Sequence, residues 1–352
     1  MSNLAQSTRI ADNFYVWSGR ANPEVVQLIG QLFADEGEQR SKELLHWQYL
    51  EHLSGAEVCI AHTAAGLFEE PAALYAAFPT RFRIAGRDET CFQSFDTLTV
   101  KRFRGRGLFT QLAELLYGRL AASGAPLVYG IPNAESFGGF TRKLHWTSLD
   151  PLPMMVRPIG LRYPRVRARI RRPRIQAAAI EPGIHVREVT TCSIEVSELI
   201  ARSNYHGKNG VIRDSDFLKW RLGRPGNSYR VLESRDGTGR LTGVLVFTLL
   251  AKHGCSVGYI MEHIIDLGHI HHGDELASAA TSCLKASGAD LVLAWALPDN
   301  VSYPCLRRQG FISLSNKVSP VELHLGYRLL DSGIGDLKRS DFAFSYLDSD
   351  TV

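Results

Sequence analysis

Two separate stretches of the N-terminal half are echoed in the C-terminal half, in the same order. The segment RSKELLHWQYL at 40–50 resembles RDSDFLKWRLG at 213–223, and YGIPNAESFGGFTRKLHW at 129–146 resembles AWALPDNVSYPCLRRQGF at 294–311. Both matches are offset by about 170 residues, and ordered matches at one spacing indicate an internal repeat. The chain therefore has to fold as two copies of one domain plan.

The 352 residues divide at a basic stretch between the copies. Eight arginines lie between Arg157 and Arg174, and no acidic residue occurs from Pro151 to Ile180. Its prolines favour an extended linker. We expect copies at 10–155 and 183–330, a linker at 156–182 and a tail at 331–352. The arginines suit either a solvated linker or a weak contact with phosphates or an anionic membrane surface.

Composition narrows the class of protein. A hydrophobic content of 45% with 22% charged residues is typical of a globular chain, and a net charge of +4 gives no case for nucleic acid binding. Six cysteines without a C-x-x-C pair favour a reducing compartment. The N-terminus lacks an apolar signal region, and no apolar run is long enough to span a membrane. We expect a cytoplasmic monomer or homodimer.

Both copies show one order of predicted elements. Helices come first, then three strands, then a helix, an apolar strand and a short closing helix. In the first copy the three strands are expected at 57–62, 72–78 and 93–100, the helix at 108–123 and the apolar strand at 127–130. In the second copy the corresponding helix and apolar strand are expected at 274–288 and 291–295. This order predicts an α/β fold with a mixed, mostly antiparallel sheet flanked by helices in each copy.

A basic, glycine-rich turn joins a strand to a helix in the first copy. SFDTLTV at 94–100 is typical of a strand, KRFRGRG follows, and LFTQLAELLYGRL has apolar residues at helical spacing. The start of a helix offers free N–H groups and a positive dipole end, and glycine lets a ligand approach the backbone. The turn therefore predicts a site for a phosphorylated ligand. It matches neither the P-loop nor the Rossmann pattern.

RFRGRG at 102–107 resembles the [QR]-x-x-G-x-[GA] acetyl-CoA motif of the GNAT acyltransferase superfamily. The second copy has no such motif, so we expect a tandem GNAT-like chain in which only the first copy holds coenzyme A. The resemblance implies that the turn holds the pyrophosphate, the end of the preceding strand pairs with pantetheine, and the closing helix lines the thiol end. The implied contacts are Leu98, Thr99, Val100, Arg102, Phe103, Arg104, Gly105, Arg106, Gly107, Leu108, Asn133, Ser136 and Phe140. Asn133 also suits a helix N-cap and Phe140 a core position.

Acyl transfer to an amine needs a base, and the thiolate that leaves benefits from a proton donor. Asp96, Glu262 and His263 are the candidate catalytic residues, although Asp96 also suits a buried hydrogen-bonded carboxylate. The tyrosine acid common in GNAT enzymes has no clear counterpart on the closing helix. Four histidines between His263 and His272 lack helical metal spacing, so we expect no metal. No nucleophile motif is present, which favours direct transfer.

Three functions remain open. The first is an N-acyltransferase that uses acyl-CoA, by default acetyl-CoA, on the primary amine of a small molecule such as a nucleotide-linked amino sugar in surface polysaccharide synthesis. The second is an acyltransferase for a peptide or lipid amine. The third is a non-catalytic protein that binds coenzyme A or acts as a scaffold.

Overall fold

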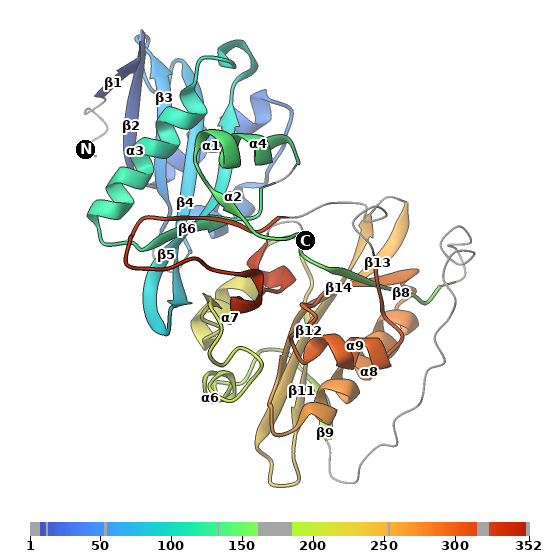
Figure 1. The fold of residues 1–352 in the computed structure, drawn as a ribbon. Helices are drawn as coiled ribbons and strands as arrows, with labels where there is room; N and C mark the ends of the chain where they lie inside the picture. The colour runs from blue at the N-terminus through green and yellow to red at the C-terminus, as the bar shows by residue number, and fades with distance from the viewer. Residues whose placement is uncertain are drawn as a thin grey trace. The chain divides into compact units, whose positions relative to one another are not determined.

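The computed structural model describes residues 8–11, 13–52, 55–132, 134–160, 185–252, 254–314 and 324–349. The chain forms two compact units (Figure 1). The first unit contains residues 1–150, 224–226 and 323–336, and the second contains residues 151–223, 227–322 and 337–352.

The sheet of the first unit has the strand order β1-β2-β3-β4-β5-β6-β16-β7. Neighbouring strands pair antiparallel, except that β5 and β6 run parallel. The strands are β1 (Thr8–Ala11), β2 (Phe14–Arg20), β3 (Glu57–Thr63), β4 (Pro71–Ile84), β5 (Arg87–Thr99), β6 (Leu127–Gly130), β7 (Thr147–Ser148) and β16 (Gly326–Leu329).

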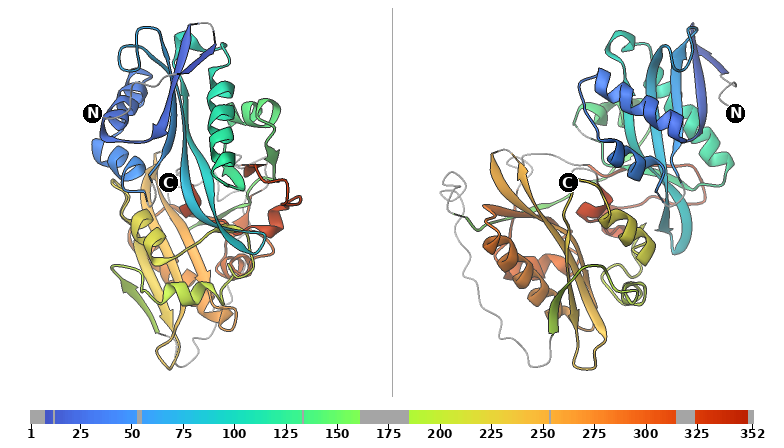
Figure 2. Two further views of the ribbon diagram at one scale, coloured as in Figure 1. Left: turned by 90° about the vertical axis from the view of Figure 1, so that its left-hand side faces the viewer. Right: turned by 180° about the vertical axis from the view of Figure 1, so that it is seen from behind.

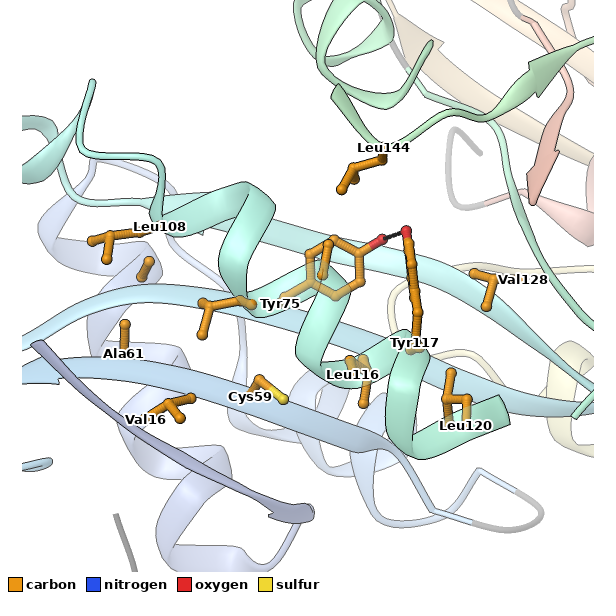
Figure 3. Close-up of a cluster of buried hydrophobic side chains, with 14 of the residues drawn as sticks. Val16, Cys59, Ala61, Tyr75, Leu108, Leu116, Tyr117, Leu120, Val128 and Leu144 are labelled. Carbon is orange, nitrogen blue, oxygen red and sulfur yellow. Dashed lines mark hydrogen bonds between the residues drawn. The ribbon is translucent and has the colours of Figure 1, made fainter. Parts of the chain in front are cut away.

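Helices cover both faces of this sheet (Figure 2). Helices α1 (Pro23–Asp35) and α2 (Lys42–Tyr49) start at the side-chain caps Asn22 and Ser41 and pack on one face. Helix α3 (Leu108–Ala122) lies on the other face, together with Phe140 of α4 (Ala134–Lys143). Figure 3 shows the apolar cluster that α3 forms with strands β2 to β4.

The sheet of the second unit has the order β15-β8-β14-β13-β12-β11-β9. Helices α8 and α9 pack on one face, and α6 and α7 lie on the other side (Figure 2). The strands are β8 (Met154–Pro158), β9 (His185–Val189), β11 (Arg230–Arg235), β12 (Leu241–Lys252), β13 (Cys255–Ile265), β14 (Leu291–Trp295) and β15 (Ile312–Ser313). The helices are α6 (Val196–Ile200), α7 (Ser215–Leu222), α8 (Ile270–Ala286) and α9 (Ser302–Arg308). Strand β10 (Gly210–Val211) and the short 3-10 helices η1 (Lys101–Phe103), η2 (Arg339–Asp341) and η3 (Tyr346–Asp348) complete the elements.

Each repeat gives one strand to the sheet of the other unit. Strand β8 follows the first repeat but pairs with β14 and β15, and β16 follows the second repeat but pairs with β6 and β7. The two sheets therefore end in equivalent triplets, β6-β16-β7 and β14-β8-β15. This matching order is consistent with a tandem repeat.

The predicted fold class, two mixed sheets flanked by helices, is confirmed. The apolar strands at 127–130 and 291–295 have the predicted bounds. Helix α8 starts at Ile270, four residues before its predicted start. Residues 156–158 of the expected linker lie in β8, and residues 161–182 lie outside the described residues. Within the described ranges, no helix is both long and apolar enough to cross a membrane.

Candidate active site

Strands β5 and β6 separate in the middle of the first sheet. Their parallel pairing consists of Phe92 with Val128 and Gln93 with Tyr129. The next part of β5, Ser94 to Thr99, is paired with β4 but has no partner on β6 among the described residues. The separation leaves one edge of β5 open to an extended ligand.

A β-bulge lies at this point of β5. Along β4 the partner changes from Thr97, opposite Tyr75, to Ser94, opposite Ala77, so β5 has one extra residue there. As a result Phe95 and Asp96 both lie on the face covered by α1 and α2, because a bulge re-aims the side chains that follow it.

The glycine-rich turn beyond β5 exposes a row of backbone N–H groups. Gly105 and Gly107 have left-handed φ values of 80° and 76°, and Gly107 is the N-cap of α3. The first helical hydrogen bond recorded runs from Gln111 N–H to Gly107 O. No hydrogen bond is recorded for the N–H groups of residues 105–110 within the described part of the chain. Such a group of amides at a helix start is suited to a phosphate.

Arginines around the turn differ in their partners. Arg102 forms an ion pair with Glu70 at 3.1 Å, and Arg104 forms one with Glu36 at 3.4 Å. Arg106 lies 5.7 Å from the ring centre of Phe14, and none of the described carboxylates forms an ion pair with it. Among the arginines of this turn, Arg106 is therefore the one without an ion pair to a described carboxylate, and it is available to an anionic ligand.

At the end of β5, successive backbone N–H groups point to opposite sides of the strand. Val100 N–H donates to Ala72 O of β4 at 3.0 Å. Because N–H groups of a strand alternate in direction, the N–H of Thr99 points to the opposite side, toward the open edge. Thr99 O accepts a hydrogen bond from Arg104 Nε at 3.1 Å on that side. Among the three strand residues expected to pair with pantetheine, Thr99 thus offers the outward N–H.

The closing helix α4 packs against the start of α3. Phe140 is buried, and its ring lies 5.3 Å from that of Phe109 and 4.5 Å from that of Trp146. Leu108 and Phe103 are also buried in this core. Ser136 is half-buried on α4, and Asn133 lies outside the described residues. The ring of His324, which precedes β16, lies 4.4 Å from that of Phe137 of α4 in a tilted arrangement.

Asp96 is a buried carboxylate with several donors on one oxygen. Its Oδ2 accepts from Arg40 at 2.8 Å, Gln48 at 2.8 Å and Tyr49 at 2.5 Å. Burial is the main reason why the pKa of Tyr49 is raised, and the Asp96 charge adds to it. Three donors on one oxygen fix the orientation of this carboxylate, and none of the described residues is recorded as a donor to Oδ1.

Glu262 and His263 lie in the second unit, whereas Asp96 lies in the first. Glu262 is buried and accepts from Arg213 at 3.0 Å, Tyr205 at 2.5 Å and Ser345 at 2.9 Å. Burial lowers the pKa of His263 to about 4, so its ring is neutral at neutral pH. Its Nε2 lies 3.1 Å from Gly273 O, and its buried Nδ1 has no partner in the described structure.

Strands β13 and β14 of the second unit also separate, after the pair Ile260–Ala294. The chain's C-terminal segment packs over this opening. Tyr346 stacks on Trp295 at 4.0 Å and meets Tyr259 edge-on at 5.5 Å. The remaining pocket, lined by His263 and by Asn300 beside α9, has room for about one water molecule. The opening is thus closed by the chain itself.

The turn after β13 already holds an anion. The Asp266 carboxylate accepts from Gly268 N–H at 2.8 Å and from Arg202 Nε at 2.6 Å. Burial alone would raise the pKa of Asp266, but these two donors lower it below its usual value. The second copy therefore places its own carboxylate where the first copy has free amides.

The histidines of the second unit do not form a metal centre in the described structure. His269, His271 and His272 lie near the start of α8, and His272 Nδ1 lies 2.6 Å from Thr242 Oγ1. Within the described ranges, no group of three or more His, Cys, Asp or Glu side chains is arranged to hold a metal ion.

Sequence reasoning missed a polar group in the apolar core under the strand separation. The hydroxyls of Tyr75 and Tyr117 lie 2.5 Å apart (Figure 3). The Tyr75 hydroxyl also lies 2.7 Å from Ser94 Oγ. Tyr75 and Tyr117 are 42 positions apart. The only signal in the sequence was a tyrosine in the apolar stripe of each element, which does not reveal the pairing.

Comparisons with known proteins agree with this geometry. A family profile described as an acetyltransferase (GNAT) domain matches residues 21–148. The fold is similar to that of a probable N-acyltransferase from Enterococcus faecalis, with a TM-score of 0.65 at 13% identity over 90% of this chain and 73% of that chain. No curated protein matches the chain.

Two further solved structures share the fold. A GCN5-related N-acetyltransferase from Anabaena variabilis has a TM-score of 0.64 at 13% identity, covering 90% of this chain and 73% of that one. A Saccharomyces cerevisiae N-myristoyltransferase with bound myristoyl-CoA has a TM-score of 0.60 at 13% identity, covering 92% and 84%. These likenesses show the fold, and the profile match shows that residues 21–148 form a GNAT acetyltransferase domain.

Proposed function

We propose that this protein is an acyl-CoA-dependent N-acyltransferase whose donor site lies in the first unit only. The observation that carries the proposal is the row of free amides at residues 105–110, next to the open edge of β5. A coenzyme A pyrophosphate on these amides would direct the pantetheine arm along β5. Thr99 N–H would then pair with the arm, and Arg106 would face a phosphate.

The second unit supports the assignment to one site by contrast. Its amide turn is occupied by Asp266, and its strand opening is covered by the segment around Tyr346. A ligand with two phosphates would have to displace a buried carboxylate there. The second unit is therefore proposed to serve structure or the acceptor site.

The proposed acceptor is the primary amine of a small molecule, with acetyl as the first acyl group to test. An amino sugar linked to a nucleotide is a candidate because its phosphates would complement the arginines of 157–174, most of which lie outside the described residues. The fold shared with an enzyme that binds myristoyl-CoA is a reason to include long-chain donors in the assay.

The proposed reaction is direct transfer. The amine nitrogen attacks the thioester carbonyl, the carbon–sulfur bond breaks, and one proton leaves the amine while coenzyme A leaves as the thiol. Asp96 is proposed as the first candidate base, since its Oδ1 carries no recorded donor among the described residues while Oδ2 carries three. Glu262 and His263 remain the candidates from the second unit.

Calorimetric titration with acetyl-CoA, followed by a thiol-release assay over a panel of amines, tests this function. We expect one acetyl-CoA per chain and release of thiol only with an acceptor amine. Binding without turnover on small, peptide and lipid amines would favour a coenzyme A-binding protein. Absence of binding would favour a scaffold, and two sites per chain would contradict assignment to the first unit.

A further inference from the structure

A chain of four hydrogen-bonding groups crosses the core of the first unit and ends at the strand separation. Trp146 Nε1 donates to Tyr117 Oη at 3.1 Å, Tyr117 Oη lies 2.5 Å from Tyr75 Oη, and Tyr75 Oη lies 2.7 Å from Ser94 Oγ. Trp146 and both tyrosines are at most 4% exposed, whereas Ser94 is half-buried. Figure 3 shows the two tyrosine hydroxyls in contact between α3 and β4.

The indole fixes the direction of this chain. An indole nitrogen can only donate, so Tyr117 accepts from Trp146. The hydrogen of Tyr117 then needs an acceptor, and Tyr75 is the one that the described residues provide. Tyr75 in turn donates to Ser94 Oγ, because a buried hydroxyl without an acceptor is costly. Ser94 is left with its own hydrogen to donate, and none of the described groups is recorded as its acceptor.

The position of Ser94 matches the reach of the donor molecule. Ser94 follows Gln93, the last residue of β5 paired with β6. Thr99, beside the amide turn, lies five residues away, or about 13 Å along the strand, because the bulge takes up one of these residues. An extended pantetheine arm has nearly this length, so a thioester carried by coenzyme A on the turn would end at Ser94. A side-chain carbon at Gly130 would lie 3.0 Å from Ser94 O, so the end of β6 comes close there.

We propose that Ser94 donates a hydrogen bond to the sulfur of coenzyme A as it leaves, and that Tyr75 and Tyr117 position this hydroxyl. The inference rests on the proposed function and adds the group that sequence analysis did not find on the closing helix. The carbon–sulfur bond breaks, its electron pair goes to sulfur, and the Ser94 O–H stabilises the thiolate until it takes a proton from solvent. Ser94 therefore keeps its proton and acts by electrostatic stabilisation.

Bound coenzyme A provides a readout that does not depend on the acceptor. A thiolate absorbs more strongly than a thiol at the short-wavelength end of the ultraviolet, so the pKa of the bound thiol can be measured by difference titration of the complex against the free protein and free coenzyme A. In the wild type we expect this pKa below that of free coenzyme A. Ser94→Ala should raise it by about one unit and lower kcat about tenfold, since a hydrogen bond to a charged group is lost. The Kd of acetyl-CoA should stay within about twofold.

Ser94→Thr keeps the hydroxyl and is the matched control, with a bound-thiol pKa near that of the wild type. Tyr117→Phe should raise the pKa in part, which a merely structural role of Tyr117 would not do. An unchanged thiol titration in Ser94→Ala would overturn the inference while the proposed function stands. Failure of the wild type to bind coenzyme A would instead remove both.

Discussion

The two strand separations of this molecule occur at equivalent places in the two sheets, but the turns that follow them differ. In the first unit β5 leaves β6 after Gln93, and in the second β13 leaves β14 after Ile260. The turn after the first opening has free amides, whereas in the turn after the second opening Gly268 N–H donates to the Asp266 carboxylate. Tyr346 also covers the second opening. The comparison teaches that two sheets of one plan can differ in the side chains and amides that they present at the same opening.

A buried ion pair is common to both units. Arg40 precedes α2 and binds Asp96 beside the β5 bulge, and Arg213 precedes α7 and binds Glu262 beside the β13 bulge. The arginines are equivalent in the sequence repeat. Each unit thus holds an arginine–carboxylate pair beside the bulge of the strand that separates from its neighbour.

The largest expected effect breaks the ion pair of the second unit. Arg213 is fully buried and also pairs with Asp348. Arg213→Ala leaves buried charges without a partner and should lower the free energy of unfolding by about 3–5 kcal/mol. Arg40→Ala should cost about 2 kcal/mol, since the Arg40 side chain is 14% exposed and Asp96 keeps two other donors. Urea denaturation measures both, and equal losses would contradict the comparison.

Substitution of the amide turn should come next. Gly105→Asp places a carboxylate and a strained backbone at the proposed pyrophosphate site and should weaken acetyl-CoA binding about a hundredfold. Gly124→Asp at the other end of α3 is the matched control, because Gly124 has a similar φ of 86° and open space around it. Calorimetry should show normal affinity for that control. Unchanged affinity of Gly105→Asp would refute the donor site.

The arginines of the turn test the same donor site, because they differ in whether a carboxylate already pairs with them. Arg106→Ala should weaken acetyl-CoA binding about tenfold, because a charge-assisted contact to phosphate is lost. Arg102→Ala should change it less than about twofold, since Arg102 is already paired with Glu70. The Arg106 effect should shrink in high salt. Titrations at two ionic strengths check this ranking, and a reversed order would count against Arg106.

A pH dependence of stability is expected in the second unit. The folded pKa of His263 is lowered to about 4 by burial, so the unfolded chain binds a proton at higher pH than the folded one. The contribution of neutral His263 to the free energy of unfolding is complete above about pH 6.5 and is lost as the pH falls toward 4. His263→Gln should make this decline shallower. Melting temperatures between pH 4 and 7 test it, and an unchanged slope would exclude a titrating His263.

The elements that local patterns define were predictable from sequence. Strands β6 and β14 have the predicted bounds because each is a short apolar run between turn residues. The turn at Gly105 was found because glycine and arginine in front of an apolar helix form a local pattern. The match to the GNAT profile confirms the family to which this pattern pointed.

Non-local partners were not predictable. Strand β8 spans the predicted boundary between the first copy and the linker, and β16 lies at the end of the predicted second copy. Nothing in their sequence shows that each completes the sheet of the other copy. The packing of Tyr346 over the second opening also depends on long-range contacts. The same holds for the hydrogen bonds that link Trp146 to Ser94 through two tyrosines. Helix α8 starts four residues before the predicted helix, because the histidines in its first turn do not continue the apolar pattern of the helix.

Because each copy supplies a strand to the sheet of the other, neither copy can complete its own sheet alone. A chain that ended at residue 314 would carry the whole amide turn and the Arg40–Asp96 pair, yet β6 and β7 would be left without β16 between them. A chain that began at residue 185 would lack β8 between β14 and β15. Removal of either copy would therefore damage both sheets, so each copy depends on the other to complete its fold.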